Sequence, residues 1–329
     1  MNNLITVNLH KVIDQFKDKK ILVVGDLILD KYIWGEVDRI SPEAPIPVID
    51  VTHENDVAGG AANTAHNIAA LGGKAVLIGV VGNDHNKEVL FNELKKQRVE
   101  IAYIVTDKKR PTTHKTRVIA QSQHLVRIDD ENKQPVDGEL TRTLVKNIKK
   151  IIEKVEIVVV SDYAKGVVTQ QLMHELAALC QHDNKKLIVD PKPQHSTFYK
   201  NVFLITPNYR EAREMVHPPA VESSQQSVDF LGNALVRQLN TKVLITQGKE
   251  GMTLFEQNAQ PLHIPTIAQE VYDVSGAGDT VVATLALALC CGCTVKDAAV
   301  LANYAAGIVV GKIGTAVVSP DELRKSLGG

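Results

Sequence analysis

The segment Gly276–Thr280 (Gly-Ala-Gly-Asp-Thr) contains residue types that can bind an anion and move a proton. Its two glycines let the backbone turn tightly and approach a ligand closely. The apolar run Val281–Cys290 that follows predicts a helix, and backbone amides at a helix N-terminus bind anions. Asp279 in such an anion hole can accept a proton from an attacking hydroxyl, while the amides stabilise a phosphoryl group in transfer. A glycine-rich helix start with an N-terminal Asp is the alternative interpretation. The catalytic prediction is Asp279 as base, with an anion hole of Gly276, Ala277 and Gly278.

A second glycine pair, Gly59-Gly60, enters a predicted helix that begins near Ala61. Small residues at this point permit close approach of the backbone to a ligand. Asn63 supplies an amide that can bind hydroxyl groups as donor and as acceptor. Packing of the helix on a sheet would explain the glycines equally well.

Asn208 and Glu211 follow a predicted strand and lie three residues apart, on one face of a starting helix. Oxygen ligands there suit a hydrated Mg²⁺ that bridges nucleotide phosphates, with Glu211 acting indirectly. The same pair also fits an ordinary capping box. The segment from Thr246 through Gly248 to Gly251 could hold nucleotide phosphate or ribose, or could be a hairpin turn.

Short apolar runs alternate with helical segments through most of the chain. The runs are near-continuous, as in strands that are covered on both faces, and this pattern predicts an α/β fold with a parallel sheet and crossover helices. Polar residues follow the strand ends, where ligands bind in open α/β sheets. We expect one shared cleft that collects Asp26, Asp162, Asp190, Lys192, Asn208 and Gly248.

Two regions interrupt this alternation, about residues 31–54 and 101–129. They read as β-strands without helices, so they cannot bury both faces in the main sheet. We interpret them as a small β lid over the cleft, one face of which must be covered by substrate, the main domain or another subunit. Since no linker, low-complexity or repeated segment occurs, residues 1–329 are predicted to be a single domain. A homodimer through the lid is the predicted assembly.

Composition excludes several classes of partner. Lys+Arg is 37 and Asp+Glu is 38, so nothing indicates a nucleic-acid or membrane surface, and a small molecule is the expected partner. The sequence shows no secretory signal and no apolar run long enough to span a membrane. The four cysteines lack the two separated ligand pairs of a zinc site, and free thiols fit a reducing compartment. A cytoplasmic location is therefore predicted.

The segments Gly59–Asn63, Asn208–Glu211 and Asp273–Asp279, in this order, resemble the ribokinase-like (PfkB) carbohydrate kinase family over nearly the whole chain. The resemblance implies a three-layer ribokinase-like sandwich with a mostly parallel central sheet and a small β-sheet lid. Five further segments resemble the heptose 7-phosphate kinases of that family: Gly25–Asp30, Arg39–Pro45, Ser161–Gly166, Asp190–Lys192 and Glu270–Asp273. Pro193 stands where many relatives have glycine.

This resemblance implies ATP-dependent phosphorylation of D-glycero-β-D-manno-heptose 7-phosphate at the C1 hydroxyl, on the route to ADP-heptose and lipopolysaccharide core. It implies that ATP and Mg²⁺ are the cofactors and that the chain is similar to the stand-alone form of the kinase. It assigns Asn208, Glu211, Thr246, Gly248, Gly251 and Asn303 to the nucleotide. It assigns Asp26, Asp30, Gly59, Gly60, Asn63, Asp162, Lys192 and Arg127 to the sugar, with Arg127 as candidate for the 7-phosphate; a surface ion pair is the alternative for Arg127.

Three other functions stay open at this point. The chain could be a related kinase for fructose, a ketose phosphate or ribose, although Arg39–Pro45 and Ser161–Gly166 favour the heptose. A sugar-binding regulator on the same scaffold would not need Asp279 or the Asn208/Glu211 pair. A dinucleotide oxidoreductase would need Gly-x-Gly-x-x-Gly directly after the first strand, where Gly25–Leu29 lacks it.

Overall fold

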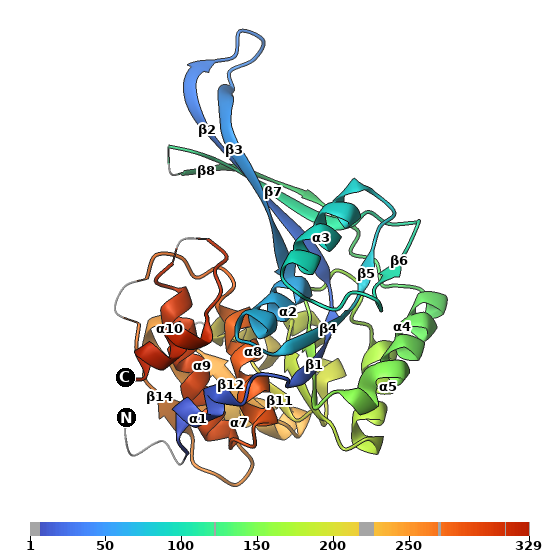
Figure 1. The fold of residues 1–329 in the computed structure, drawn as a ribbon, viewed down its shortest axis with the longest axis vertical. Coiled ribbons are helices and arrows are strands. Elements are labelled where there is room, and N and C mark those ends of the chain that lie inside the picture. Colours follow the sequence, from blue (N-terminus) through green and yellow to red (C-terminus); the bar gives the residue numbers. More distant parts are fainter. Residues whose placement is uncertain (1–6, 122, 217–226, 269–270, 313, 329) are drawn as a thin grey trace.

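The structure, a computed structural model, describes residues 7–121, 123–216, 227–268, 271–312 and 314–328 (Figure 1). Its centre is an eight-stranded sheet with the strand order β14-β13-β12-β11-β10-β9-β1-β4. The six strands from β12 to β4 are parallel, and β13 and β14 are antiparallel at one edge. These strands are β1 (Lys20–Gly25), β4 (Lys74–Ile78), β9 (Ile157–Ser161), β10 (Lys186–Asp190), β11 (Leu204–Ile205), β12 (Lys242–Thr246), β13 (Met252–Phe255) and β14 (Leu262–Ile264).

Helices cover both faces of this sheet, because its strands are apolar on both sides. Along β1, Ile21 and Val23 pack into one core cluster, whereas Leu22 and Val24 pack into the other. The first cluster includes residues of α1 (Leu9–Asp14), α2 (Ala61–Ala70), α3 (His85–Lys96), α8 (Ala277–Cys290), α9 (Val295–Val309) and α10 (Pro320–Ser326). The second includes residues of α4 (Gly138–Ile151), α5 (Gln170–His182), α6 (Tyr209–Val216) and α7 (Val228–Leu239). The predicted three-layer fold is confirmed.

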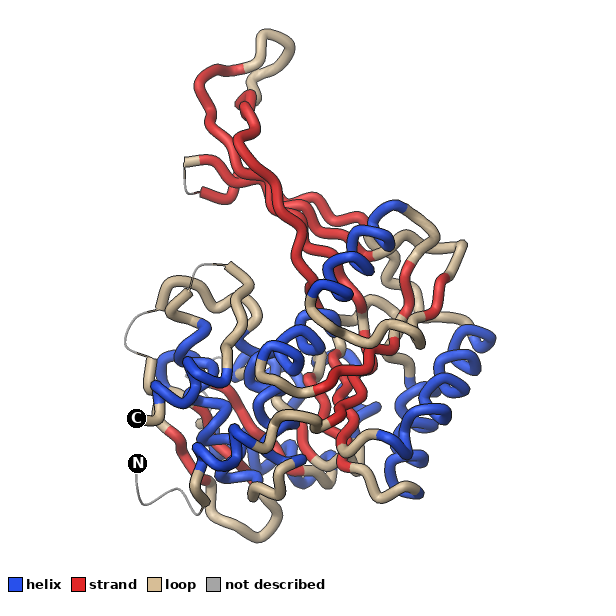
Figure 2. Tube along the Cα trace, in the orientation of Figure 1, coloured by secondary structure: helices blue, strands red, loops and turns tan. Residues whose placement is uncertain are grey.

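A second sheet projects from this body, as Figure 2 shows. Its strand order is β3-β2-β7-β8, and β2 (Leu27–Ile40) pairs along its whole length with β3 (Pro47–Gly60). The strand β2 is buried at its start and exposed at its end, so the sheet is rooted in the body and open at its tip. The other two strands are β7 (Thr113–Ala120) and β8 (Gln123–Asp130).

The second predicted lid region, about residues 101–129, contributes fewer residues to the small sheet than the sequence suggested. It enters the small sheet only at Thr113, whereas β6 (Val105–Thr106) pairs with β5 (Val80–Val81) in a separate two-stranded sheet. Three short 3-10 helices complete the described elements: η1 (Ile152–Lys154), η2 (Pro193–Tyr199) and η3 (Gly248–Glu250). In the described part of the chain, no helix is both long and apolar enough to cross a membrane.

The parallel register brings the polar strand ends together. Gly25 pairs with Ser161, and Ser161 pairs with Asp190 on its other side. The backbone amide of Asp26 donates to Ser161 O (3.3 Å), and that of Asp162 donates to Asp190 O (3.1 Å). Three strands that are distant in sequence therefore end side by side, and both β9 and β10 contact α8. The first strand of the small sheet, β2, begins directly after β1 (Figure 1).

Candidate active site

Asp279 lies in the first turn of α8 and is 3% exposed. Gly276 caps this helix with φ of 77°, a left-handed conformation that favours glycine. A Cβ added to Gly278 would meet nothing within 4 Å, so there is open space beside the turn. The amide of Ala277 already donates to Val274 O (3.2 Å), which removes one of the three predicted anion-hole donors in this state of the protein.

The carboxylate of Asp279 accepts hydrogen bonds from three side chains. Asn63 Nδ2 donates to Oδ2 (2.7 Å) and Thr64 Oγ1 donates to Oδ1 (2.6 Å), both from the first turn of α2. The hydroxyl of Tyr163 donates to both oxygens, at 3.3 Å and 3.2 Å. Burial raises the pKa of Asp279 to about 6, and the hydrogen bonds from Thr64, Asn63 and Tyr163 oppose a larger rise.

The amide of Asn63 is oriented by two residues behind it. Asn67 Nδ2 donates to Asn63 Oδ1 (3.3 Å), and Thr280 Oγ1 donates to Asn67 Oδ1 (2.7 Å). This chain of bonds leaves the NH₂ group of Asn63 to point at Asp279. The sequence assigned Asn63 to the sugar, whereas the structure uses its amide to hold the carboxylate.

Asp26 is buried and holds the loop that follows β9. Its carboxylate accepts the backbone amides of Tyr163 (2.8 Å), Lys165 (3.1 Å) and Val167 (3.0 Å). Burial and, after it, the neighbouring Asp162 raise the pKa of Asp26 to about 6, although these three backbone bonds lower it. In the structure Asp26 therefore contacts the loop backbone, where the resemblance had assigned it to the sugar.

Asp162 has a similar structural position. It accepts the amide of Ala164 (2.7 Å), which has φ of 54°, and it also accepts from the hydroxyl of Tyr199 (2.6 Å). His195 Nδ1 lies 2.7 Å from the same carboxylate, which raises the pKa of His195. Asp162 is fully buried, and these contacts fix the turn that carries Tyr163. Asp162 therefore helps to position Tyr163 in the site.

Asp30 and the glycine pair meet at the base of the small sheet. Arg117 Nη1 donates to Asp30 Oδ1 (2.6 Å). A Cβ on Gly59 would collide with the Asp30 carboxylate, and one on Gly60, at φ of 58°, would collide with the Asp26 carbonyl. Glycine is thus needed at both positions because other groups of the cleft wall approach the backbone there. Asp30 thus lies against Arg117 and Gly59, and its contact with the sugar stays a prediction.

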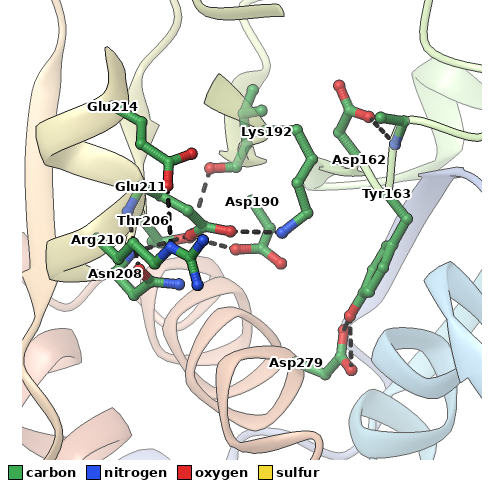
Figure 3. Close-up of polar contacts among 12 residues, drawn as sticks. Asp162, Tyr163, Asp190, Lys192, Thr206, Asn208, Arg210, Glu211, Glu214 and Asp279 are labelled. Carbon is green, nitrogen blue, oxygen red and sulfur yellow. Dashed lines mark hydrogen bonds and ion pairs between the residues drawn. The ribbon is translucent and has the colours of Figure 1, made fainter. Parts of the chain in front are cut away.

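The ammonium of Lys192 points toward the carboxylates of Glu211 and Asp190, as Figure 3 shows. Its ammonium pairs with Glu211 and lies over the ring of Tyr163, 5.4 Å from the ring centroid. Burial would lower the pKa of Lys192, but Glu211 and Asp190 outweigh it and raise that pKa. Burial raises the pKa of Asp190 well above its usual range, with further contributions from the charges of Asp279 and Glu211. Carboxyl groups therefore outnumber cations in this part of the cleft.

Asn208 and Glu211 form a reciprocal cap at the start of α6. The Glu211 amide donates to Asn208 Oδ1 (2.9 Å), and the Asn208 amide donates to Glu211 Oε2 (3.0 Å). The capping interpretation is thus realised, and the other oxygen of Glu211 faces Lys192. Asn208 also forms a parallel bridge with Thr246, so the structure brings these two predicted nucleotide residues together.

Of the other three residues predicted to bind the nucleotide, only Gly248 has open space beside it, whereas Gly251 and Asn303 contact other parts of the chain. Gly248 has φ of 58° and open space around its Cα, as a ligand-facing turn requires. Gly251 has φ of 89° and is packed against the carbonyl of Ile264, so it serves the hairpin. Asn303 is 3% exposed and donates to Pro265 O (2.8 Å), so its amide holds the segment after β14.

Arg127 lies on β8 opposite Arg117 of β7, and its side chain is 59% exposed. It pairs with Asp129, to which Lys115 also binds. Lys115, Lys133 and Lys165 surround Glu131, and they lower its pKa to about 2 against the effect of burial. Five cations in this network therefore share three carboxylates: Lys115, Arg117, Arg127, Lys133 and Lys165 against Asp30, Asp129 and Glu131.

Four residues of this site were not assigned a role from the sequence: Thr64, Tyr163, Asp190 and Arg117. Asp190 is the last residue of β10, and Tyr163 lies two residues after the end of β9. Polar residues at strand ends had already indicated a cleft. Thr64 follows Asn63 in the same helical turn. Arg117 stands two residues after Lys115, and this period of two places both cations on one face of a strand.

The family described as "pfkB family carbohydrate kinase" matches residues 18–322. Bifunctional protein HldE of Desulfatibacillum aliphaticivorans is 42% identical over 327 residues, which cover 98% of this chain and 66% of that protein. The protein of the same name from Geobacter metallireducens is 41% identical over 322 residues, covering 98% and 65%. This chain thus spans slightly under two thirds of the length of these relatives.

Solved structures share the fold at low sequence identity. Ribokinase of Arabidopsis thaliana, complexed with ribose and ATP, has a TM-score of 0.73 at 21% identity and covers 95% of this chain and 99% of its own. Phosphofructokinase-2 of Escherichia coli, in complex with potassium, has a TM-score of 0.76 at 20% identity, with 94% and 97% covered. At this identity the likeness extends to the fold alone.

The raised pKa of Asp279 predicts a pH-dependent stability. The folded protein holds this proton up to about pH 6, whereas the unfolded chain loses it near pH 4. Stability should therefore be greatest below about pH 4 for this group and fall as pH rises to 6, by about 2–3 kcal/mol. Urea unfolding of the protein between pH 4 and 7 measures the fall.

The variant Asp279→Asn should flatten part of this slope, because Asn does not titrate. Asp38→Asn, at an exposed position near the tip of the small sheet, is the matched control and should leave the slope unchanged. Equal slopes in the wild type and in Asp279→Asn would show that the Asp279 proton does not contribute.

Proposed function

Because this chain belongs to the pfkB family of carbohydrate kinases, we propose that it transfers the γ-phosphoryl group of ATP to the C1 hydroxyl of D-glycero-β-D-manno-heptose 7-phosphate. The observation that carries the proposal is the buried carboxylate of Asp279 in the first turn of α8, next to open space at Gly278. A base beside helix amides is the arrangement that phosphoryl transfer to a hydroxyl requires. The segments Arg39–Pro45 and Ser161–Gly166 support the heptose as substrate. The cytoplasmic location and the place in ADP-heptose synthesis stay predictions.

In the proposed reaction, the proton of the sugar C1 hydroxyl moves to the carboxylate of Asp279. The sugar oxygen then forms a bond to the γ-phosphorus, while the bond from this phosphorus to the bridging oxygen breaks and ADP leaves with the electron pair. Asn63 and Thr64 hold the carboxylate in a fixed orientation for this transfer. The N-terminal turn of α8, including Gly278, faces the charge that develops on the phosphoryl oxygens.

A hydrated Mg²⁺ fits the other side of the cleft. Burial and the charges of Asp279 and Glu211 raise the pKa of Asp190, and the ammonium of Lys192 pairs with Glu211. A cation near Asp190 would offset these neighbouring charges. Both oxygens of Glu211 are already engaged, by Asn208 and by Lys192, so its part in metal binding would be through water. The ion would neutralise charge on the nucleotide phosphates. Among described residues, no three His, Cys, Asp or Glu side chains are arranged to bind a metal directly.

The cationic network of the small sheet supports a phosphorylated sugar. Arg117 and Arg127 are directly opposite each other on antiparallel strands, and like charges in such a pair destabilise it unless an anion is shared. Arg117 also binds Asp30 at the base of the sheet, so this pair connects to the sugar side of the cleft. We propose that the 7-phosphate binds between Arg117 and Arg127, with Lys115 nearby. A kinase for fructose or ribose would have no use for this positive charge.

The small sheet also supports the predicted homodimer. Ile40, Val51, Val126 and Ile128 are large apolar side chains on its strands, and each is exposed in the single chain. Residues 126 and 128 alternate with Arg127, so the apolar side chains of β8 lie on the face opposite the arginine. Apolar strand faces of this kind are usually covered, and a second small sheet is the occupant that matches them in shape and polarity.

The replacement Asp279→Asn tests the base. Asn keeps the size of Asp but accepts the proton far less readily, so kcat with ATP and heptose 7-phosphate should fall at least about 10²-fold. Calorimetry should still show binding of both substrates, because the backbone of α8 and other side chains hold them. A near wild-type rate would refute Asp279 as base, and loss of sugar binding would make it an anchor instead.

The phosphate proposal predicts a change in substrate preference. Arg127→Met should raise KM for heptose 7-phosphate about 10- to 100-fold, as expected for one lost charge-assisted contact, with a smaller effect on kcat. It should hardly affect any turnover of unphosphorylated heptose. Arg142→Met, at an exposed position of α4, is the control. An unchanged KM in Arg127→Met would remove this residue from the site, and a panel with fructose, fructose 6-phosphate and ribose identifies the preferred sugar.

The metal proposal predicts that turnover stops in excess EDTA and returns with added Mg²⁺. Glu211→Gln should raise KM for Mg·ATP more than KM for the sugar, since Glu211 lies on the nucleotide side. Glu214→Gln, one turn further along α6, removes a carboxylate that pairs only with the exposed Arg210 in the described contacts, and serves as control. Undiminished activity in EDTA would contradict this part of the mechanism.

The dimer proposal predicts twice the chain mass of 35.9 kDa by light scattering at micromolar concentration. The double variant Val126→Glu with Ile128→Glu should be monomeric, because it places charges in the proposed interface. Phe230→Glu changes an exposed apolar residue on α7, away from the small sheet, and should remain dimeric. A monomeric wild type would be the contrary result.

A further inference from the structure

The carboxylate of Asp279 has little hydrogen-bonding capacity left in the ligand-free protein. An ionised carboxylate offers about four lone-pair positions. Asn63 and Thr64 each take one, and the hydroxyl of Tyr163 lies across both oxygens. If the substrate hydroxyl is to donate its proton to Asp279, it needs one of the positions that Tyr163 now covers.

The three donors differ in the strength of their bonds. Asn63 and Thr64 lie at 2.7 Å and 2.6 Å, which are lengths of charge-assisted hydrogen bonds. Tyr163 lies at 3.3 Å and 3.2 Å, although an O–H donor to a carboxylate normally approaches to about 2.5–2.7 Å. The bond of Tyr163 is therefore weak and shared between two oxygens, and it is the one that a stronger donor can replace.

The supporting structure of the donors differs in the same way. Asn63 and Thr64 are buried in the first turn of a helix, and Asn67 fixes the Asn63 amide from behind. The backbone of Tyr163 is held by Asp26, but its ring contacts the ammonium of Lys192, which itself pairs with Glu211 on the nucleotide side. The position of the Tyr163 side chain therefore depends on groups that ligands would contact.

We propose that the Tyr163 hydroxyl occupies the place of the substrate's nucleophilic hydroxyl on Asp279, and that the sugar displaces it on binding. This inference rests on Asp279 being the base. Tyr163 is then a positioning residue that keeps water off the carboxylate while no sugar is bound. Without it, a water molecule at this place could give its proton to Asp279 and attack the γ-phosphorus of ATP, which yields ADP and inorganic phosphate in place of the sugar phosphate.

Four charged side chains lie around Asp279 and Tyr163: Asp30, Asp190, Lys192 and Arg117. Asp279 faces Asp30 of β2 and Asp190 of β10, and both are carboxylates that disfavour a second negative charge. Burial raises the pKa of Tyr163 well above its usual range, with further contributions from Asp279 and Asp190, so its hydroxyl stays protonated and can only donate to the carboxylate in this site. Lys192 is the cation over its ring, and Arg117 is bound to Asp30.

The variant Tyr163→Phe removes the hydroxyl and keeps the ring that Lys192 contacts. With ATP alone, it should hydrolyse ATP about tenfold faster than the wild type or more, since a positioned base contributes at least that much once water can reach it. A thermal melt shows whether the variant is folded, and kcat with heptose 7-phosphate shows whether its cleft is intact.

The pH profiles give a second, independent readout. The acid limb of kcat/KM reports the free enzyme, and that of kcat reports the enzyme with substrate bound. Loss of the Tyr163 bond should raise the Asp279 pKa in the free enzyme, so the kcat/KM limb should move up by about half a pH unit or more. The kcat limb should stay in place, because the sugar has displaced Tyr163 in the wild type as well.

Other results overturn the proposal. If both limbs shift together, Tyr163 stays on Asp279 throughout the reaction; if neither limb shifts and hydrolysis is unchanged, its hydroxyl only packs. Tyr199→Phe is the matched control, because it removes a buried hydroxyl from Asp162 on the same loop without touching Asp279. Faster ATP hydrolysis in Tyr199→Phe equal to that in Tyr163→Phe would attribute the effect to a loosened loop.

The proposed function and this inference fail separately. An active Asp279→Asn variant would refute Asp279 as base and with it this inference, while the kinase activity would stand; failure of the wild type to phosphorylate heptose 7-phosphate would refute the proposed function. An inactive Asp279→Asn together with an unaltered Tyr163→Phe would leave the kinase mechanism in place and reject only the displacement of Tyr163.

Discussion

The buried carboxylate of Asp279 is the constraint around which the cleft is built. Moving a charged carboxylate out of water costs free energy unless hydrogen-bond donors replace its hydration. The donors around Asp279 offset only part of this cost, so burial still raises its pKa. The donors come from α2 and from the loop after β9, so residues 63, 163 and 279 must converge from distant parts of the chain. The glycine pair at the end of β3 allows this, because side chains at Gly59 and Gly60 would collide with Asp30 and Asp26.

The same constraint explains the contacts that two other buried acids of the site make. Asp26 and Asp162 accept backbone amides of the loop that carries Tyr163, so they define where its hydroxyl lies. Parallel strand register places both acids at neighbouring strand ends. Carboxylates bind backbone amides strongly in a dry environment, and a loop fixed in this way needs no regular secondary structure of its own.

The alternation of apolar runs and helical segments predicted the parallel sheet and its crossover helices, because buried parallel strands and amphipathic helices have distinct periodicities in a sequence. The three-layer arrangement came from the family resemblance. Residues at strand ends were likewise predicted to gather in one place, and the register of β1, β9 and β10 does gather them. The sequence did not reveal which partner each polar side chain would take: Asn63 faces Asp279, Asp26 faces the loop, and Asn303 faces Pro265. That choice depends on directions of side chains across α2, β9 and α9, which no local pattern of residues specifies.

One side of the cleft has more carboxyl groups than cations, and the other side has more cations than carboxyl groups. On the side of β10 and α6, Asp190, Glu211 and Asp279 gather around Lys192, whereas on β7 and β8 cations outnumber carboxylates. Self-repulsion of each group is a cost that the folded protein carries without ligands. A metal–nucleotide complex on the first side and a sugar phosphate on the second would each relieve it. Asp30 accepts a hydrogen bond from Arg117, and its charge also raises the pKa of Asp279. A change in the charge around Arg117 would therefore change the electrostatic field at the proposed base. In the proposed reaction, binding of the two substrates would therefore be coupled through Asp279 without any need for the sheets to move.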